Sequence, residues 1–425
     1  MRIYIETYGC AANQGDASIA AGILAKNGHK IVEHIEDADI LILFTCIVID
    51  KTEQRMLHRM KIFGESGKPV IIGGCMPSAL PSLVKKIMPS AALLPPRYIH
   101  QVSEVLEKKE VAFYQKDKAT LPRMVDKKTN IPISDGCLYN CSYCITKKAR
   151  GNLTSYSEDG IANAVHDAVE RGCREVRITS QDTAAYGMDT GGSLPSLVNK
   201  ICMIDGNFMV RIGMMHPISL KRGMDEITDL FLNERVYKFL HLPLQSGSDE
   251  ILKKMRRGHT LGEFTNIVNK LRKKIPDITL ATDVIIAFPS ETEEQFEETC
   301  NAIKKIRPDV INITRFSPRP YTDVKKMKGR IGTKEAKERS RKMTEIASRI
   351  TLENNRRCIG KSYNAIILEK HGNWMVGKTE NYKSVFLEDG KIGEFVEVKV
   401  GDTTETHLFG AIENIIYKKN LLPLR

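Results

Sequence analysis

The middle of the chain repeats one pattern six times between residue 131 and about residue 318: a short apolar run followed by an amphipathic segment. Short apolar runs that alternate with helical segments are typical of βαβ units built around a parallel sheet. The expected strands are 131–134, 175–179, 208–212, 239–242, 279–286 and 310–313, and the expected helices lie near 157–171, 194–204, 219–233, 260–274 and 291–306. Six units are too few to close an eight-stranded barrel, so the pattern predicts an open, partial (β/α)6 barrel.

The segment before this repeat predicts a smaller doubly wound α/β domain. Its expected parallel strands are 3–5, 40–44 and 70–72, and its expected helices lie near 14–27, 50–65 and 78–89. A polar, Lys-rich stretch over 110–130 follows and has the composition of a linker.

The segment after the repeat has a different character. A long charged helix is expected near 333–357. Short alternating runs then follow, separated by Gly, Asn and Asp, at 363–368, 374–378, 384–387, 394–400 and 407–412. They predict a small all-β barrel of oligonucleotide-binding size, although a dimerisation or lid module could show the same pattern. The expected domains are 1–110, 123–356 and 357–421.

Three cysteines follow the first strand of the repeat, in the run Asp135-Gly-Cys137-Leu-Tyr-Asn-Cys141-Ser-Tyr-Cys144. Thiolates are the preferred ligands of iron–sulfur clusters, and three of them can hold a [4Fe–4S] cluster with one iron left open. A structural zinc site needs four closed ligands, and no fourth Cys or His follows nearby. Ten cysteines in 425 residues are too sparse for a disulfide scaffold. We call this set the first cysteine site.

A second set of cysteines lies in the N-terminal domain. Cys10, Cys46 and Cys75 each come just after one of its three expected strands. Because the carboxyl ends of parallel strands share one edge of a sheet, these thiols should meet there. A single buried cysteine is usually core packing, but three at matching strand ends favour a second three-thiolate site. We call this set the second cysteine site.

The charge and composition of the chain indicate which binding partners to expect. The formal net charge is +12 and the pI is about 9.1, which favours nucleic acid over a membrane as partner. The basic stretches 253–257 and 325–328 could grip phosphates, although each could also be a solvated helix face. No secretory signal and no apolar run long enough to cross a membrane are present, so we expect a cytoplasmic protein.

Polar residues at other strand ends point to a ligand in the barrel mouth. They are 180–183, Arg211, His216 and 245–248. Tyr143, between the last two cysteines, could stack on an adenine or shield a cluster.

The first cysteine site with Tyr143 is the signature of the radical S-adenosylmethionine (SAM) enzymes, and the chain resembles their methylthiotransferase branch over nearly its whole length. The motifs that carry the resemblance are 136–151, 7–10 with Asn13 and Asp16, 45–48, 74–77, 243–249, 283–289 and 317–320. The C-terminal barrel is similar to the TRAM RNA-binding module. Runs 149–156 and 180–187 resemble the archaeal and eukaryotic enzymes that act on N6-threonylcarbamoyladenosine (t6A) at position 37 of the tRNA anticodon loop.

The resemblance implies a mechanism with two [4Fe–4S] clusters. The first cysteine site would bind SAM at its open iron and cleave it to a 5′-deoxyadenosyl radical, while the second would bind the inserted sulfur. A second SAM would methylate that sulfur. We expect SAM contacts from Tyr143, Gln181, Arg211, Gln245 and Ser246. An electron donor such as a ferredoxin or flavodoxin and a sulfur source are also implied.

Alternative functions remain open, and three residues differ from the usual pattern of the family. The chain could act on isopentenyladenosine in tRNA or on a ribosomal protein, or it could be a non-catalytic iron–sulfur RNA-binding regulator. Phe44 stands where the family usually has Asn, and Ser290 and Tyr321 stand where it usually has Gly. These departures affect local loop geometry and remove no cysteine. Loss of 362–425 should weaken tRNA binding and leave SAM cleavage largely intact.

Overall fold

The N-terminal part is a parallel sheet with helices on both faces, as predicted, but it has five strands because β2 and β5 add to the three expected ones. The computed structural model describes residues 1–48, 50–107 and 112–416, so the expected boundaries at 110 and 421 lie outside the described residues. The elements are β1 (Arg2–Thr7), α1 (Ala11–Lys26), β2 (Lys30–Val32), β3 (Ile40–Thr45), α2 (Asp50–Glu65), β4 (Val70–Gly74), α3 (Cys75–Ala79), α4 (Pro81–Ile87), β5 (Ala92–Leu94) and α5 (Val102–Leu106). The strand order is β2-β1-β3-β4-β5. Apolar residues of α1 and α5 cover one face, and those of α2 and α4 cover the other.

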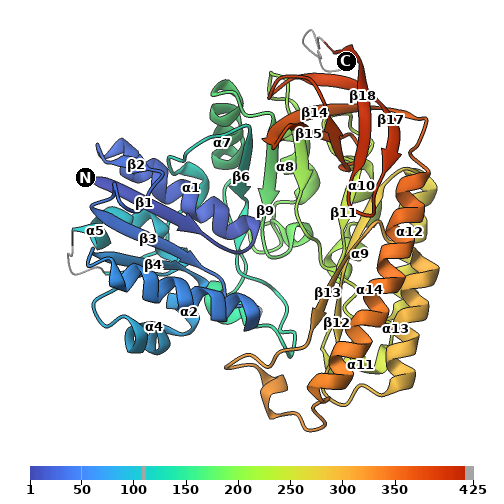
Figure 1. Ribbon diagram of the computed structural model, residues 1–425, viewed down its shortest axis with the longest axis horizontal. Helices are drawn as coiled ribbons and strands as arrows, with labels where there is room; N and C mark the ends of the chain where they lie inside the picture. The colour runs from blue at the N-terminus through green and yellow to red at the C-terminus, as the bar shows by residue number, and fades with distance from the viewer. Residues whose placement is uncertain (49, 108–111, 417–425) are drawn as a thin grey trace.

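The central part is an open barrel of six parallel strands, as the repeat predicted (Figure 1). Its strands are β6 (Lys128–Pro132), β9 (Glu175–Thr179), β10 (Met209–Ile212), β11 (Phe239–His241), β12 (Thr279–Ile286) and β13 (Val310–Arg315). They form two three-stranded sheets, β6-β9-β10 and β11-β12-β13. A single parallel β-bridge between Val210 and Val236 joins the two sheets. Among the described strands, β6 and β13 do not pair with each other, so the barrel stays open.

Helices surround the barrel and cover its two edges. They are α6 (Thr146–Arg150), α7 (Glu158–Glu170), α8 (Leu194–Cys202), α9 (Pro217–Arg222), α10 (Met224–Leu230), α11 (Asp249–Lys254), α12 (Leu261–Lys274), α13 (Glu293–Ile306) and α14 (Thr333–Arg356), and a short hairpin pairs β7 (Ser134–Asp135) with β8 (Thr154–Ser155). Helix α1 packs on β6, and α14 packs on β13. The predicted helix at 219–233 is divided at Gly223, and α11 was not predicted.

The C-terminal part is a closed five-stranded barrel, as expected. Its strands are β14 (Ser362–His371), β15 (Trp374–Thr379), β16 (Ser384–Leu387), β17 (Phe395–Thr403) and β18 (Leu408–Ile415), in the order β14-β15-β16-β18-β17. It packs near the N-terminal ends of the central strands, where its Ile366, Leu368 and Tyr382 meet Tyr237 and Phe239. Deleting this domain would expose apolar barrel surface, so truncation is a poor test of its role in RNA binding.

The expected linker is not solvated throughout. Lys118 is fully buried in a short 3-10 helix, Lys118–Thr120, and Arg123 is 3% exposed. The Lys-rich composition of 110–130 suited a linker, but hydrogen bonds hold both cations inside. Lys118 donates to Asp16, and Arg123 donates to the Lys118 carbonyl oxygen. The linker prediction is therefore wrong around these two residues.

Two of the departures occupy special backbone positions. Ser290 and Tyr321 have φ angles of 60° and 62°, in the left-handed region. Glycine adopts this region without steric cost, whereas for other residues it costs about 1–2 kcal/mol. The loops thus keep the conformation that glycine would favour. Phe44 is fully buried at the end of β3.

Candidate active site

The first cysteine site lies in the loop between β7 and α6, beyond the end of the first barrel strand. Gly136 begins this loop with a φ of 80°, and a Cβ there would lie 2.0 Å from the Asn152 carbonyl oxygen. Its N–H donates to Gln181 Oε1 at 2.7 Å. The Ser142 hydroxyl donates to the Lys254 carbonyl oxygen at 2.8 Å. The loop is thus fastened to two sides of the barrel mouth.

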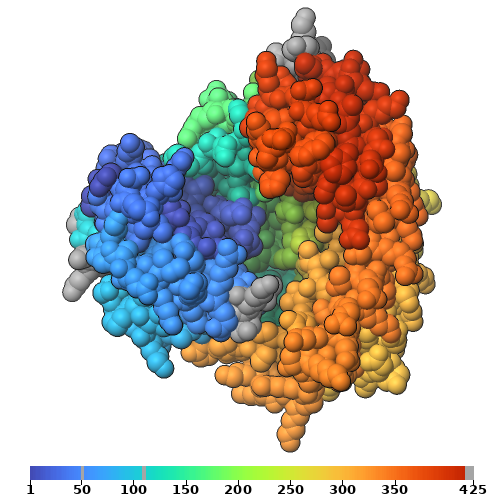
Figure 2. Space-filling view, in the orientation of Figure 1, coloured from blue at the N-terminus to red at the C-terminus, as the bar shows by residue number. Residues whose placement is uncertain are grey.

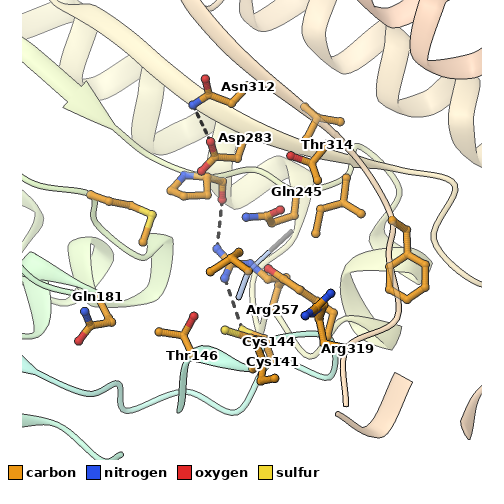
Figure 3. A pocket seen from close by; sticks show the side chains of 18 of the residues that line it. Cys141, Cys144, Thr146, Gln181, Gln245, Arg257, Asp283, Asn312, Thr314 and Arg319 are labelled. Atoms are coloured by element: carbon orange, nitrogen blue, oxygen red, sulfur yellow. Dashed lines mark hydrogen bonds between the residues drawn. The ribbon is translucent and has the colours of Figure 1, made fainter. Parts of the chain in front are cut away.

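Cys137, Cys141 and Cys144 line one cavity of about 530 Å³ (Figure 3). This volume is in the range of small-molecule and cofactor sites. No three His, Cys, Asp or Glu side chains among the described residues lie close enough together to hold a single metal ion. A cubane cluster spreads its thiolates over different irons, whereas a zinc ion gathers its thiolates at about 2.3 Å from one centre. Three separated thiols around one cavity suit a cluster better than zinc.

A buried guanidinium contacts the first cysteine site. Arg257 is 5% exposed, and its Nη1 donates to Cys141 Sγ at 3.5 Å (Figure 3). Its Nη2 donates to the Pro243 carbonyl oxygen at 3.1 Å. Burial raises the pKa of the Cys141 thiol, and the charge of Arg257 opposes that shift. The expectation that the whole of 253–257 could grip phosphates is wrong for Arg257, because its side chain points inward.

The second cysteine site lies at the carboxyl edge of the N-terminal sheet. Cys10 precedes α1, Cys46 follows β3, and Cys75 begins α3 directly after β4. Asn13 Nδ2 donates to the carbonyl oxygens of Tyr8 at 2.7 Å and Thr45 at 2.9 Å. This amide therefore holds the loops of Cys10 and Cys46 together.

The thiols of the second cysteine site also interact through their charges. Burial raises the pKa of the Cys75 thiol to about 12. The Arg150 guanidinium opposes that shift, whereas Cys10 and Cys46 add to it. The thiols of Cys10 and Cys46 are thus close enough to Cys75 to influence its titration.

The N-terminal domain that carries the second cysteine site adjoins the cavity of the first cysteine site. Val48, two residues after Cys46, lines the cavity of the first cysteine site. Helix α3 packs on α6, and the Ser78 hydroxyl donates to the Ala149 carbonyl oxygen at 2.7 Å. Figure 2 shows this face of the molecule hollowed between the blue N-terminal domain, the orange β13 region and the red C-terminal barrel. These contacts hold the N-terminal domain against the mouth of the barrel.

The predicted SAM contacts divide into two groups. Tyr143, Gln181 and Gln245 line the cavity, and Gln245 has a φ of 74° between two backbone bonds to β12. Ser246 does not line it, since its buried hydroxyl lies 3.2 Å from Thr299 Oγ1. Arg211 does not line it either, because its guanidinium stacks on the rings of Phe239 and Tyr382.

The remaining cysteines belong to neither cysteine site. Cys173, Cys300 and Cys358 are buried, and Cys202 is half-buried. His216, expected at the barrel mouth, lines the cavity and stacks on Tyr139 with ring centroids 3.9 Å apart.

A four-membered ion-pair ring joins the two cysteine sites and was not predicted. Asp16 and Asp135 alternate with Lys118 and Arg150, and all four side chains are at most 2% exposed. The four N–O distances are 2.5 to 2.7 Å. The sequence shows only that Asp16, Asp135 and Arg150 each lie within six residues of a cysteine; the position of Lys118 carries no local signal. We call these residues the ion-pair ring.

Polar groups on the far wall of the cavity were also missed. Asp283 accepts from Asn312 Nδ2 at 2.8 Å (Figure 3). Its carboxylate also lies 3.0 Å from His241 Nε2. Arg319 pairs with Glu53 of α2, which ties the segment after β13 to the N-terminal domain. Arg315 also lines the cavity and is exposed, and its side chain makes no hydrogen bond or ion pair within the described residues.

Comparison with known families agrees with this arrangement. Residues 131–303 match the Radical SAM superfamily, 2–94 match the uncharacterized protein family UPF0004, and 356–412 match the TRAM domain. Among solved structures, the radical SAM methyltransferase TsrM from Kitasatospora setae superposes with a TM-score of 0.55 at 12% identity, covering 87% of this chain and 79% of its own. An open barrel with three cysteines at its mouth, on this fold, defines an enzyme of the radical SAM class.

Two curated relatives show to which family of the radical SAM class the chain belongs. A probable threonylcarbamoyladenosine tRNA methylthiotransferase of Methanocaldococcus jannaschii is 40% identical, over 97% of both chains. The human threonylcarbamoyladenosine tRNA methylthiotransferase is 30% identical, over 96% of this chain and 73% of its own. The chain belongs to this family of radical SAM transferases. No helix of the described residues has the length and apolarity needed to cross a membrane.

Proposed function

We propose that the chain methylthiolates C2 of t6A at position 37 of tRNA, using SAM and two [4Fe–4S] clusters. The observation that supports this proposal best is the three-cysteine site that lines the cavity of the central barrel, with three more thiols at the carboxyl edge of the adjoining sheet. Substrate choice rests on the names of the relatives, which are of the t6A type in archaea, fly and human. The same names disfavour isopentenyladenosine, a ribosomal protein or a purely regulatory role.

The residues present suit the proposed cofactors. Each cysteine site offers three thiols, the donors that iron–sulfur clusters prefer. When bound, a cluster with SAM supplies the radical chemistry that an unreactive aromatic C–H requires. The first cysteine site would hold the SAM-cleaving cluster, and Gln181 and Gln245 would contact SAM across the cavity. The second cysteine site would hold the sulfur to be inserted.

This chain's other residues then orient the reactants and exclude water. Arg257 holds Cys141 in place and brings a positive charge next to the cluster. The Asp283 carboxylate, fixed by His241 and Asn312, offers a rigid acceptor on the opposite wall. Fixed groups of this kind lower the barrier by pre-organisation, because they need not rearrange during the reaction.

The proposal names further partners. The TRAM match and the net charge of +12 support binding to tRNA phosphates by the C-terminal barrel. A ferredoxin or flavodoxin would deliver electrons, and a sulfur source would reload the second cysteine site. All of these partners are found in the cytoplasm, where we place the protein.

Counting iron tests the two-cluster proposal. After anaerobic reconstitution, the wild-type chain should hold about eight irons, four for each [4Fe–4S] cluster. Replacing the cysteines of either site with alanine should leave about four. A Cys202→Ala control should keep the wild-type value, since Cys202 lies in neither site. Four irons in the wild type, all lost with the first cysteine site, would contradict a second cluster.

Arg315 provides a test of the substrate. The threonylcarbamoyl group ends in a carboxylate, whereas an isopentenyl group is apolar, and Arg315 is a cation of the cavity wall with no bond to other described side chains. A hydrogen bond to a charged group contributes about 1.5–3 kcal/mol. Arg315→Met should therefore lower kcat/KM on t6A-containing tRNA by roughly 10- to 100-fold. Arg315→Lys should retain part of the activity.

The matched control is Arg349→Met, which removes an exposed cation outside the cavity. Its methylthiolation kinetics should equal those of the wild type. Equal kinetics for Arg315→Met as well would show that Arg315 does not read the carboxylate.

A further inference from the structure

A second cavity lies at the opposite end of the central barrel from the cysteines. Its volume is about 260 Å³, and its walls come from the barrel, the end of α14 and the C-terminal domain. Thr279 is the first residue of β12, and Asp309 directly precedes β13, so the cavity is at the N-terminal strand ends. The active-site cavity is reached from the other ends of the same strands, through Ile285 and Arg315. We call the second cavity the junction cavity.

The junction cavity is strongly basic. Six cationic side chains line it, against only two carboxylates, those of Asp277 and Asp309. The cations are Arg272, Lys305, Arg307, Arg357, Lys361 and Lys383. Like charges gathered in a concave site repel one another and raise the local concentration of anions. The excess of cations therefore favours an anionic ligand.

Half of these cations have protein partners and half do not. Lys383 pairs with Asp309 at 3.0 Å, and Arg307 pairs with Glu353 at 2.6 Å. Arg272 donates to backbone carbonyl oxygens at the end of α13. These contacts give the three side chains a structural role within the protein.

The other three cations are available. Lys305, Arg357 and Lys361 are exposed, and their side chains make no hydrogen bond or ion pair anywhere in the described part of the chain. Burial lowers the pKa of Arg272, the charge of Asp309 opposes this shift, and the charges of Arg357 and Arg307 add to it.

A buried hydroxyl supplies an independent sign of a ligand. Thr279 is 3% exposed, and its Oγ1 has no hydrogen-bond partner within the described structure although it is a residue of the cavity wall. Buried hydroxyls are nearly always bonded, because an unsatisfied one costs about 1–3 kcal/mol. A ligand oxygen in the cavity would satisfy it.

We propose that the junction cavity binds a phosphate group. A phosphate has the negative charge that complements the cations and several acceptor oxygens for guanidinium, ammonium and hydroxyl donors. Two sources share this chemistry: a phosphodiester of the RNA backbone and a free phosphate. The position between the barrel and the TRAM-like domain favours the RNA phosphodiester. This inference concerns a site remote from the cysteines and does not depend on the reaction proposed above.

Two charge-matched double variants of the full chain test the proposal. Lys305→Glu/Arg357→Glu changes the cavity, whereas Lys304→Glu/Arg356→Glu makes the same charge change on exposed neighbours that do not line it. Unmodified tRNA transcript and inorganic phosphate are the probes, and binding is measured by fluorescence anisotropy and calorimetry. Matching circular dichroism spectra and unfolding midpoints establish that the variants are folded. Lys305→Gln/Arg357→Gln replaces the cavity variant if it does not fold.

For an RNA phosphodiester, the cavity variant should bind tRNA at least about 10-fold more weakly than its control. Its plot of log affinity against log salt should be shallower by about 0.7 to 0.9 for each RNA phosphate that the variant no longer neutralises. For a free phosphate, inorganic phosphate should bind the control and not the cavity variant, with equal tRNA affinities. Cavity and control variants that agree with both probes would overturn the proposal.

Discussion

Replacing all three residues of the second cysteine site with alanine is expected to separate the two halves of the reaction. The variant should still cleave SAM to 5′-deoxyadenosine at a rate similar to the wild type, because the first cysteine site and its Arg257 contact remain. It should form no methylthio product, because the sulfur would have no binding site. Both products are measured in one assay by mass spectrometry.

The matched variant carries the same change at the first cysteine site. It should lose 5′-deoxyadenosine and methylthio product together, to the level of a reaction without enzyme, since the cofactor supplies that chemistry. Methylthiolation that survived in the first variant would show that Cys10, Cys46 and Cys75 do not carry the sulfur.

Breaking the ion-pair ring is expected to have the largest effect on stability. Lys118→Met removes one cation from between Asp16 and Asp135 and leaves two carboxylates buried with only Arg150. Removing one partner of a buried ion pair costs about 3–5 kcal/mol, because the remaining charge stays desolvated. The free energy of unfolding should fall by about this amount in urea denaturation of the cluster-free chain.

The control for Lys118→Met is Lys200→Met, which removes the exposed partner of Asp159. An exposed ion pair adds little to stability, so this control should unfold like the wild type. The ring spans the N-terminal domain, through Asp16, and the barrel mouth, through Asp135 and Arg150. Lys118→Met should therefore lower methylthiolation more than SAM cleavage. Wild-type stability for Lys118→Met would contradict a structural role of the ring.

Most of the architecture could be predicted because it depends on local patterns. Apolar runs such as 279–286 locate barrel strands directly, and strand ends locate the cysteines. Helix α11 was missed because it has only six residues, four of them charged, which resembles a solvated segment. The burial of Lys118 was missed because its partners are far away in the sequence: Asp16 is 102 positions away and Asp135 is 17. Arg257 was assigned to the surface because its neighbours in the sequence are basic.

The assignment of cofactor contacts shows where strand position alone is insufficient. Gln245 and Ser246 are adjacent, yet only Gln245 lines the cavity. Gln245 has left the strand conformation, with a φ of 74°, and the hydroxyl of Ser246 turns toward Thr299 of α13. Arg211 contacts Tyr382 of the C-terminal barrel, a partner that no feature of the central repeat could reveal.

The most direct test of the central claim is mass spectrometry of tRNA nucleosides from a host that makes t6A but not its methylthio derivative. Expression of the wild-type chain should convert t6A to methylthio-t6A, and the variant without the second cysteine site should not. Unchanged t6A with the wild-type chain, although the purified protein cleaves SAM, would contradict the proposed substrate.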